Sequence, residues 1–182
     1  MCTGPILSTV STAYAWTIYE ALGSSKIPEF DVLFGPAYKG IALAAVTSLT
    51  LWTRHEVSVG FAYDRKEVKD HGEGGKMVGS DVRGKKVVIL DDVMTSGKAI
   101  RGAMESVSEA GGKVVGVVQL LDREEVGLGK STVEEIEEMI GEKGSVISVL
   151  KMKDLMEWLD DKKEMKVELI KMKEYRNLYV VS

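Results

Sequence analysis

The sequence predicts an α/β fold in which a mostly parallel central sheet is flanked by helices. Short apolar runs with strand character alternate along the chain with longer segments of helical spacing, an order that is typical of βαβ units. The chain has 182 residues, a length that favours a single domain, spanning 1–182, with one sizeable core. In such folds ligands bind at the carboxyl ends of the strands, so the residues after each predicted strand are the first candidates for a site.

The positions of the elements follow from apolar spacing and from the residues that interrupt it. Strands are expected at 32–34, 57–63, 85–90, 113–121 and 146–149. Helices are expected at 6–22, 40–53, 96–110, 133–140 and 153–160. Tryptophan occurs in three predicted helical segments, at Trp16, Trp52 and Trp158, and each is expected to bury apolar area on its helix face.

Two segments are expected to differ from this regular pattern. Residues 64–76 combine many charges with several glycines, a composition that predicts a mobile loop. Residues 162–182 are rich in Lys and Met, and we expect this tail to be a packing helix or a terminal strand.

Composition and charge argue against several classes of function. The formal net charge is −4, so no broad basic surface for nucleic acid is expected. The one cysteine, Cys2, fits a reducing compartment. No secretory signal is recognisable, and the longest apolar stretch, Ile41 to Val46, is too short to span a bilayer. We therefore expect a cytoplasmic protein that binds neither nucleic acid nor a membrane.

Residues 87–100 carry the strongest chemical signal. An apolar run, Val87 to Leu90, ends in two adjacent carboxylates, and a Thr-Ser-Gly segment then leads into a predicted helix. Backbone N–H groups of residues 95–99 can bind a phosphate at the helix N-terminus, and Gly97 permits close approach of the backbone. Asp91 and Asp92 can accept hydrogen bonds from vicinal ribose hydroxyls. A βα turn with an Asp pair that caps the helix is the simpler alternative, but the pattern favours a sugar phosphate.

Two further segments carry polar residues in informative positions. Residues 34–40 read Phe-Gly-Pro-Ala-Tyr-Lys-Gly and follow a predicted strand. Residues 61–75 place four basic side chains within seven positions, namely Arg65, Lys66, Lys69 and His71. Such a cluster suits a ligand of high negative charge.

Together these three segments resemble orotate phosphoribosyltransferase, a type I phosphoribosyltransferase family, and its fungal type most closely. The resemblance runs from about Thr3 to Leu150. It implies the type I phosphoribosyltransferase fold and transfer of ribose 5-phosphate from phosphoribosyl pyrophosphate (PRPP) to orotate in pyrimidine (UMP) biosynthesis. It also implies Mg²⁺ as cofactor and a homodimer with shared active sites.

The resemblance assigns roles residue by residue. It implies PRPP binding by Tyr38, Lys39, Arg65, Lys66, Lys69, His71, Asp91, Asp92, Val93, Met94, Thr95, Ser96, Gly97, Lys98 and Ala99. It implies catalytic roles for Arg65, Lys66, Lys69, His71 and Asp92, of which Arg65, Lys69 and His71 would act across the dimer interface. Thr95 and Arg123 would bind orotate. No direct metal ligand is expected, because Mg²⁺ would be held mainly by PRPP and water.

The sequence departs from the family pattern in two places. Lys98 occupies a position where the family usually has Thr; the lysine either adds a cation near the phosphate or points to solvent. Family members also normally begin earlier, with a helix and a small hood over orotate, so we expect the hood to be missing or incomplete and activity to be reduced.

Two other functions are compatible with part of the pattern. The first is a non-catalytic or impaired PRPP-binding protein, either a regulator or a truncated remnant. The second is a purine phosphoribosyltransferase, which shares the acidic motif but lacks the Arg-Lys-x-x-Lys-x-His segment.

Overall fold

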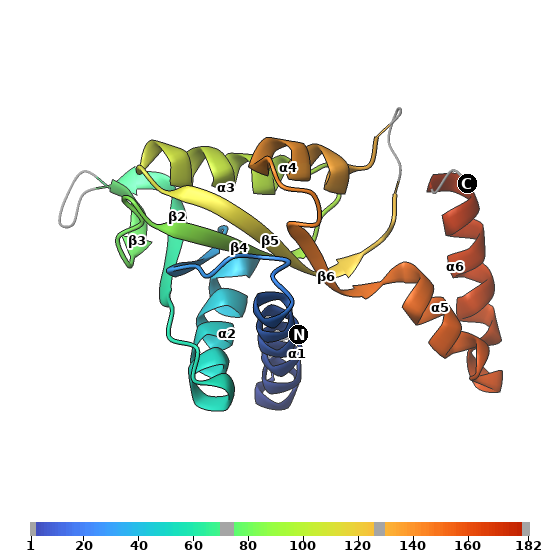
Figure 1. The fold of residues 1–182 in the computed structure, drawn as a ribbon. Helices are drawn as coiled ribbons and strands as arrows, with labels where there is room; N and C mark the ends of the chain where they lie inside the picture. Colours follow the sequence, from blue (N-terminus) through green and yellow to red (C-terminus); the bar gives the residue numbers. More distant parts are fainter. Residues whose placement is uncertain (1–2, 70–74, 126–129, 180–182) are drawn as a thin grey trace.

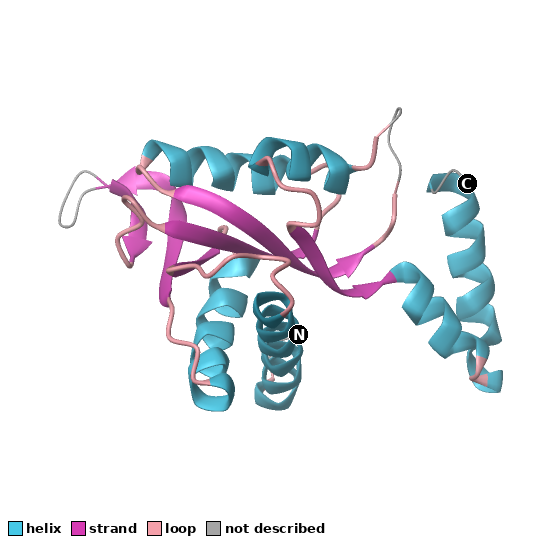
Figure 2. Ribbon diagram, in the orientation of Figure 1, coloured by secondary structure: helices cyan, strands magenta, loops and turns pink. Residues whose placement is uncertain are grey.

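A six-stranded sheet forms the centre of the molecule, with the strand order β3-β2-β1-β4-β5-β6 (Figures 1 and 2). The computed structural model describes residues 3–69, 75–125 and 130–179. The strands are β1 (Val32–Gly35), β2 (Gly60–Lys69), β3 (Gly75–Gly79), β4 (Lys86–Val93), β5 (Lys113–Asp122) and β6 (Val146–Lys151). β3 pairs with β2 in antiparallel orientation, and all other neighbours are parallel. The predicted α/β fold with a mostly parallel sheet is confirmed.

Helices cover both faces of the sheet (Figure 1). α1 (Gly4–Gly23) and α2 (Lys39–His55) pack on one face, and α3 (Lys98–Glu109) and α4 (Thr132–Ile140) pack on the other. α5 (Met152–Asp160), a 3₁₀ turn (Lys163–Met165) and α6 (Lys166–Tyr179) project beyond the β6 edge. No helix within the described ranges is long and apolar enough to cross a membrane.

Alternation along the central strands creates a separate core on each face. Leu33 and Val88 contribute to the core beneath α1 and α2, whereas Phe34 and Val87 contribute to the core beneath α3 and α4. These side chains are almost completely buried, as expected for a parallel sheet that is covered on both sides. The apolar run in β4 is therefore continuous in sequence because both of its faces need apolar residues.

The predicted loop over residues 64–76 is wrong in its extent. Residues 64–69 continue β2, and residues 75–76 begin β3, with Asp64 opposite Met77 and Lys69 opposite Gly75. Backbone hydrogen bonds make this pairing, so charged side chains are compatible with it at the edge of a sheet. Residues 70–74 lie outside the described residues. β2 also begins at Gly60, three positions later than expected.

Other boundaries differ in ways that matter for the site. β4 extends through Asp91 and Asp92 to Val93, because Asp91 pairs with Gln119 and Val93 with Leu121 on β5. α3 begins at Lys98 instead of Ser96. The acidic residues thus belong to the end of the strand, and residues 94–97, Met-Thr-Ser-Gly, form the connection to the helix.

The tail and the tryptophans complete the comparison with the sequence. The tail forms a helix, α6, which buries Leu169; this matches the expected packing helix. The expectation that all three tryptophans bury their area is wrong, since Trp16 and Trp52 are each 57% exposed and Trp158 is 54% exposed. Tryptophan is apolar enough to suggest burial, but helical spacing alone does not tell which face packs on the sheet.

Candidate active site

A pocket of about 580 Å³ lies at the carboxyl ends of β1 and β4. In the sheet, β1 lies between β2 and β4. The strand order therefore reverses at this point, and in open α/β sheets ligands bind where the order reverses. The lining residues come from four segments and are Pro36, Ala37, Asp64, Arg65, Lys76, Asp91, Val93, Met94, Thr95, Ser96, Gly97, Lys98, Ala99, Ile100, Gly102 and Ala103.

The two carboxylates at the end of β4 occupy different environments. Asp91 is only 9% exposed, and its Oδ1 accepts the Asp92 backbone N–H at 2.9 Å. Burial raises the pKa of the Asp91 carboxyl group, and the nearby Asp92 charge acts in the same direction. Asp92 instead forms an ion pair with Lys39, with Nζ 2.8 Å from Oδ2. The hydrogen bond and charge of Asp92 raise the pKa of Lys39, which keeps the lysine protonated.

Tyr14 of α1 fixes the backbone beside this acidic pair. Its hydroxyl donates a hydrogen bond of 2.7 Å to the backbone carbonyl of Asp91, and its side chain is completely buried. Burial raises the pKa of Tyr14, and the two nearby carboxylates raise it further, so the phenol remains a proton donor. The N-terminal helix α1 thus orients the end of β4, although the two elements are far apart in the sequence.

The Thr95–Lys98 turn is held by side chains of two helices, α3 and α4. Gly97 adopts a φ of 67° at the N-cap of α3, a conformation that glycine reaches without strain. Thr132 Oγ1 at the start of α4 donates to the Thr95 carbonyl at 2.9 Å. Arg101 donates from its guanidinium group to the Ser96 carbonyl. Two carbonyls of the turn are therefore held from the side of α3 and α4, and residues 95–99 line the pocket.

A buried polar pair supports the residue before this turn. The Gln119 side chain on β5 is 1% exposed, and its Oε1 accepts the Met94 N–H at 3.1 Å. Its Nε2 donates to Ser148 Oγ on β6 at 3.1 Å. This chain of hydrogen bonds connects three adjacent strands and fixes where β4 ends.

Asp64 connects the β1 loop with the far side of the pocket. Its Oδ1 accepts the Ala37 N–H at 3.0 Å. Its Oδ2 lies 3.5 Å from Ser106 Oγ, which also accepts a hydrogen bond of 2.9 Å from Lys76 Nζ. Lys76 thereby brings a cation to the pocket wall that the sequence reasoning did not identify.

The β1 loop itself is tightly packed. A Cβ on Gly35 would lie 2.2 Å from the Gly40 carbonyl oxygen, so the start and end of the loop touch backbone to backbone. The Ala37–Tyr38 peptide bond is cis. Tyr38 is 69% exposed and Lys39 begins α2, which places both at the mouth of the site.

The structure brings most of the predicted PRPP residues together. Those that line the pocket are Arg65, Asp91, Val93, Met94, Thr95, Ser96, Gly97, Lys98 and Ala99. Tyr38, Lys39 and Asp92 are not part of the lining, although Lys39 and Asp92 contact each other beside it. The side chains of Lys66 and Lys69 and all of His71 lie outside what the structure describes.

Arg123 follows β5, one strand away from the Asp91–Asp92 pair. It does not line the pocket. Its Nε lies 3.0 Å from Glu125 Oε1, and its guanidinium carbon lies 5.8 Å from the ring centre of Tyr175. Its predicted partner Thr95 does line the pocket, so the two predicted orotate residues share one edge of the sheet without a common cavity.

Within residues 3–69, 75–125 and 130–179, no group of three or more His, Cys, Asp or Glu side chains could hold a metal ion. The carboxylates at this pocket are those of Asp64 and Asp91, which line it, and that of Asp92 beside it. Carboxylates and phosphate oxygens are the ligands that Mg²⁺ prefers, so the donors fit an ion that is shared with a phosphorylated ligand.

Residues that the sequence reasoning missed are mostly supporting groups. Tyr14, Gln119 and Thr132 act through hydrogen bonds to backbone atoms of β4 or its following turn. Their partners are far away in sequence, so no local pattern could reveal them. A buried Gln in an otherwise apolar strand was the one local signal, because such a side chain needs partners.

This fold and this site define a phosphoribosyltransferase domain. Residues 5–145 match the family model described as the phosphoribosyl transferase domain. The chain is 44% identical over 180 residues to the orotate phosphoribosyltransferase of Escherichia coli strain K12 / DH10B, covering 98% of this chain and 81% of the relative. The chain belongs to the orotate phosphoribosyltransferase family.

Solved structures agree with this assignment. The crystal structure of orotate phosphoribosyltransferase from Francisella tularensis is 32% identical with a TM-score of 0.77, covering 99% of this chain and 83% of that one. The Mycobacterium tuberculosis enzyme in complex with PRPP has a TM-score of 0.60 at 23% identity, covering 80% of this chain and 75% of that one. The latter likeness supports the fold alone.

Proposed function

We propose that the chain catalyses transfer of ribose 5-phosphate from PRPP to N1 of orotate, giving orotidine 5′-phosphate and pyrophosphate in de novo pyrimidine biosynthesis. The observation that carries the proposal is the adjacency of the Asp91–Asp92 pair to the turn at the N-terminus of α3, both beside one pocket. One group recognises hydroxyls and the other recognises phosphate, so together they suit a phosphorylated ribose.

The turn would bind the 5′-phosphate. The N–H groups of residues 95–99 surround the start of α3, where the helix dipole favours negative charge. α3 has no acidic residue in its first turn, so the first turn of the helix itself carries no charge that repels a phosphate. Lys98 either adds a cation near the phosphate or points to solvent. It lines the pocket, which supports the first of these alternatives.

The ion pair between Lys39 and Asp92 would be exchanged when PRPP binds. Lys39 is protonated and lies at the mouth of the site, so pyrophosphate oxygens can replace the Asp92 carboxylate as its partner. Asp92 is then free to accept a ribose hydroxyl hydrogen bond. Held beside the sugar in this way, its carboxylate would stabilise the positive charge of an oxocarbenium-like state that develops as the bond to pyrophosphate breaks.

Further roles remain proposals that rest on the resemblance. Arg65 lines the pocket and would, with Lys66, Lys69 and His71, neutralise the leaving pyrophosphate. His71 would also donate a proton to it. Arg65, Lys69 and His71 would act in the second site of a homodimer. Mg²⁺ would be held by pyrophosphate oxygens and water near Asp91 and Asp92, and when bound it supplies charge neutralisation of the leaving group.

Finer points of the assignment stay predictions. Closer kinship to the fungal type is one, because the curated relative reported above is bacterial. A cytoplasmic location is another, supported by the single cysteine in the sequence. PRPP and orotate are the small-molecule partners that the proposal requires.

The test follows the absorbance change of orotate in the presence of PRPP and Mg²⁺. The wild-type chain should consume orotate and release equimolar pyrophosphate, and Asp91→Asn combined with Asp92→Asn should weaken PRPP binding by about 1.5–3 kcal/mol or more, as expected for lost charged hydrogen bonds. Binding of PRPP without any orotate consumption would favour the non-catalytic PRPP-binding alternative. Unchanged PRPP affinity in the double variant, measured by calorimetry, would contradict the assignment of the site.

A further inference from the structure

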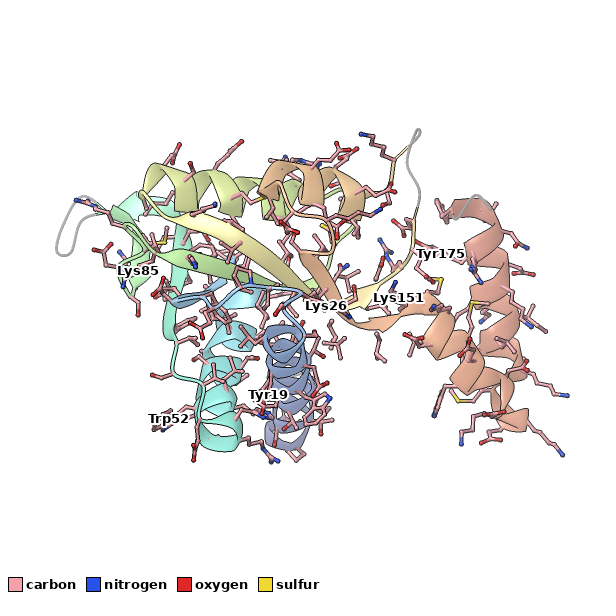
Figure 3. The ribbon with its side chains drawn as sticks, in the orientation of Figure 1. Tyr19, Lys26, Trp52, Lys85, Lys151 and Tyr175 are labelled. Atoms are coloured by element: carbon pink, nitrogen blue, oxygen red, sulfur yellow. The ribbon has the colours of Figure 1, made fainter. Side chains whose placement is uncertain are left out.

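The segment after β5 is held by both helices at the C-terminal end of the structure. Glu124 Oε2 accepts the backbone N–H of Lys153 in the first turn of α5 at 3.1 Å. Tyr175 of α6 donates a hydrogen bond from its hydroxyl to Glu125 Oε1. Figure 3 labels Tyr175 on the flank of α6 that faces the rest of the molecule. Arg123, the residue proposed to bind the orotate carboxylate, is therefore next to two anchored glutamates.

The guanidinium group of Arg123 is fixed from two directions. Glu125 faces one edge, with Oε1 at 3.0 Å from Nε and Oε2 at 3.4 Å from Nη2. The central carbon of the Arg123 guanidinium group lies over the Tyr175 ring, 5.8 Å from the ring centre, which is within the range of a cation–π contact. The Arg123 and Glu125 side chains are 29% and 26% exposed, so both contacts are partly shielded from water.

These contacts leave hydrogen-bonding capacity on Arg123. Nε is buried and is not aligned for a hydrogen bond to Glu125 despite the short distance. Within the part of the chain that the structure describes, Nη1 of Arg123 has no hydrogen-bond partner. A guanidinium group has five donors in a planar fork, so the edge away from Glu125 can still receive a planar carboxylate in a bidentate arrangement.

Tyr175 is suited to holding this pair together. The hydrogen bond to Glu125 raises the pKa of Tyr175, which keeps the phenol protonated as a donor to the carboxylate. The same side chain supplies the ring that contacts Arg123. One residue on α6 thus contacts both members of the ion pair.

We propose that Tyr175 and Glu125 are positioning residues for orotate: α6 holds Glu125 against one edge of Arg123 and so aims the other edge at the substrate carboxylate. The proposal rests on the proposed function, because it takes Arg123 as the partner of orotate. It predicts that the C-terminal helix affects recognition of orotate and leaves recognition of PRPP unchanged.

The experiment compares steady-state kinetics of three variants of the full chain. Tyr175→Phe removes the hydrogen bond and keeps the ring, so KM for orotate should rise roughly three- to tenfold, the size expected for one hydrogen bond. Glu125→Gln should raise it similarly, and Tyr175→Ala should raise it further. The KM for PRPP and the kcat should change by less than about twofold in Tyr175→Phe, because neither PRPP binding nor the reacting atoms depend on α6.

Tyr179→Phe is the matched control. Its ring contacts that of Tyr175, with 4.6 Å between the ring centres, and it is 51% exposed. It lies on the same helix and loses the same hydroxyl, but it has no contact with Glu125 or Arg123 among the described residues. Its kinetics should match the wild type.

The coupling to Arg123 provides the sharpest readout. In a chain that already carries Arg123→Gln, Tyr175→Phe should no longer change KM for orotate, because the group that it positions is gone. Should Tyr175→Ala fail to fold by circular dichroism, Tyr175→Phe and Glu125→Gln still decide the matter.

Three results would overturn the proposal. A lower KM for orotate in Tyr175→Phe would mean that Glu125 competes with the substrate, an unchanged KM would mean that α6 has no role, and equal effects on PRPP and orotate would mean a merely structural one. A wild-type chain that binds no orotate would overturn the proposed function as well, whereas an active wild type with unaffected variants would overturn only the positioning role.

Discussion

The Asp91 carboxyl group illustrates how the charge that would favour ligand binding can disfavour folding. The folded protein binds a proton at Asp91 more tightly than the unfolded chain does, because burial raises the pKa of this carboxyl group. Its contribution to stability is therefore present at low pH and is lost as the pH rises through the raised pKa. Above its raised pKa the buried, ionised Asp91 disfavours the fold, and the proposed function gives a reason to keep the charge, because it would bind PRPP.

Replacing this carboxylate by its neutral isostere should separate the two demands. Asp91→Asn keeps an oxygen that can accept the Asp92 N–H, so we expect a higher free energy of unfolding at neutral pH and weaker PRPP binding. The stability gain should shrink as the pH falls toward the ordinary pKa of Asp, where both proteins are neutral at this position. Denaturant unfolding across this pH range and calorimetric titration of PRPP measure the two effects.

The control for this prediction is Asp81→Asn. Asp81 is exposed and also accepts a backbone N–H, that of Arg83 at 3.0 Å, so its replacement should give no comparable gain at neutral pH. A loss of stability in Asp91→Asn at neutral pH would show that the carboxylate is stabilised by contacts that outweigh its burial.

At this scale the sequence predicted the residues that line or border the pocket better than those that support them. Asp91, Asp92 and the turn after them form one continuous motif, so their neighbourhood follows from chain order. Tyr14 and Gln119 reach the same place only through the packing of α1 and β5 against β4. The physical cause is that hydrogen bonds to backbone atoms depend on three-dimensional position and leave no fixed spacing in sequence.

Among the elements, the start of α3 depends most on one backbone conformation. Gly97 has a φ of 67°, and a Cβ there would lie 2.6 Å from Thr132 Cγ2. Gly97→Ala should therefore lower the free energy of unfolding by about 1–2 kcal/mol for the left-handed conformation and should also weaken PRPP binding, because the turn that presents its N–H groups must shift. Chemical denaturation and calorimetry measure both losses.

Gly102→Ala, one turn further along α3, gives a contrast of opposite sign. A methyl group there meets no atom within 4 Å, and alanine favours the helix interior over glycine, so stability should rise by about 0.5–1 kcal/mol. Equal destabilisation by both substitutions would point to general sensitivity of the helix and would contradict the specific role of Gly97.

The β2–β3 hairpin is the element that sequence reasoning described least well. Residues 64–69 and 75–76 have the composition of a loop, yet they pair as antiparallel strands. Amino-acid composition indicates whether side chains favour contact with water. Strands at the edge of a sheet can face solvent, so charged residues do not distinguish them from a loop. The pairing that makes it a strand comes from backbone groups, which composition does not describe.

The molecule as a whole exposes an aromatic cluster on α1 and α2. Trp16, Tyr19 and His55 are in mutual ring contact, and Figure 3 labels Tyr19 on α1 beside α2. The family resemblance predicts a homodimer whose sites are shared. We therefore expect sedimentation and light scattering to give twice the mass of 19.9 kDa, independent of whether PRPP is present.

Mixing two inactive variants would test whether the sites are shared. Subunits with Lys69→Ala and subunits with Asp92→Asn should together recover part of the wild-type activity, because one of the two mixed sites would combine two intact contributions. A monomeric protein that is fully active would contradict the shared-site arrangement, and recovery that is absent in a stable dimer would mean that each subunit completes its own site.

The hydrogen bond from Tyr14 to Asp91 also constrains the order of events during synthesis. The two residues are 77 positions apart, so α1 leaves the ribosome long before its partner on β4 exists. Gln119 and then Ser148 must follow before the backbone of Met94, just after β4, has its full support. A nascent chain released before β6 would thus contain every residue of the turn, together with Arg101 and Thr132 that hold it, and would still lack Ser148, the partner of the Gln119 side chain. We expect acquisition of PRPP binding to be a late event in translation, which places the site among the last parts of this protein to mature.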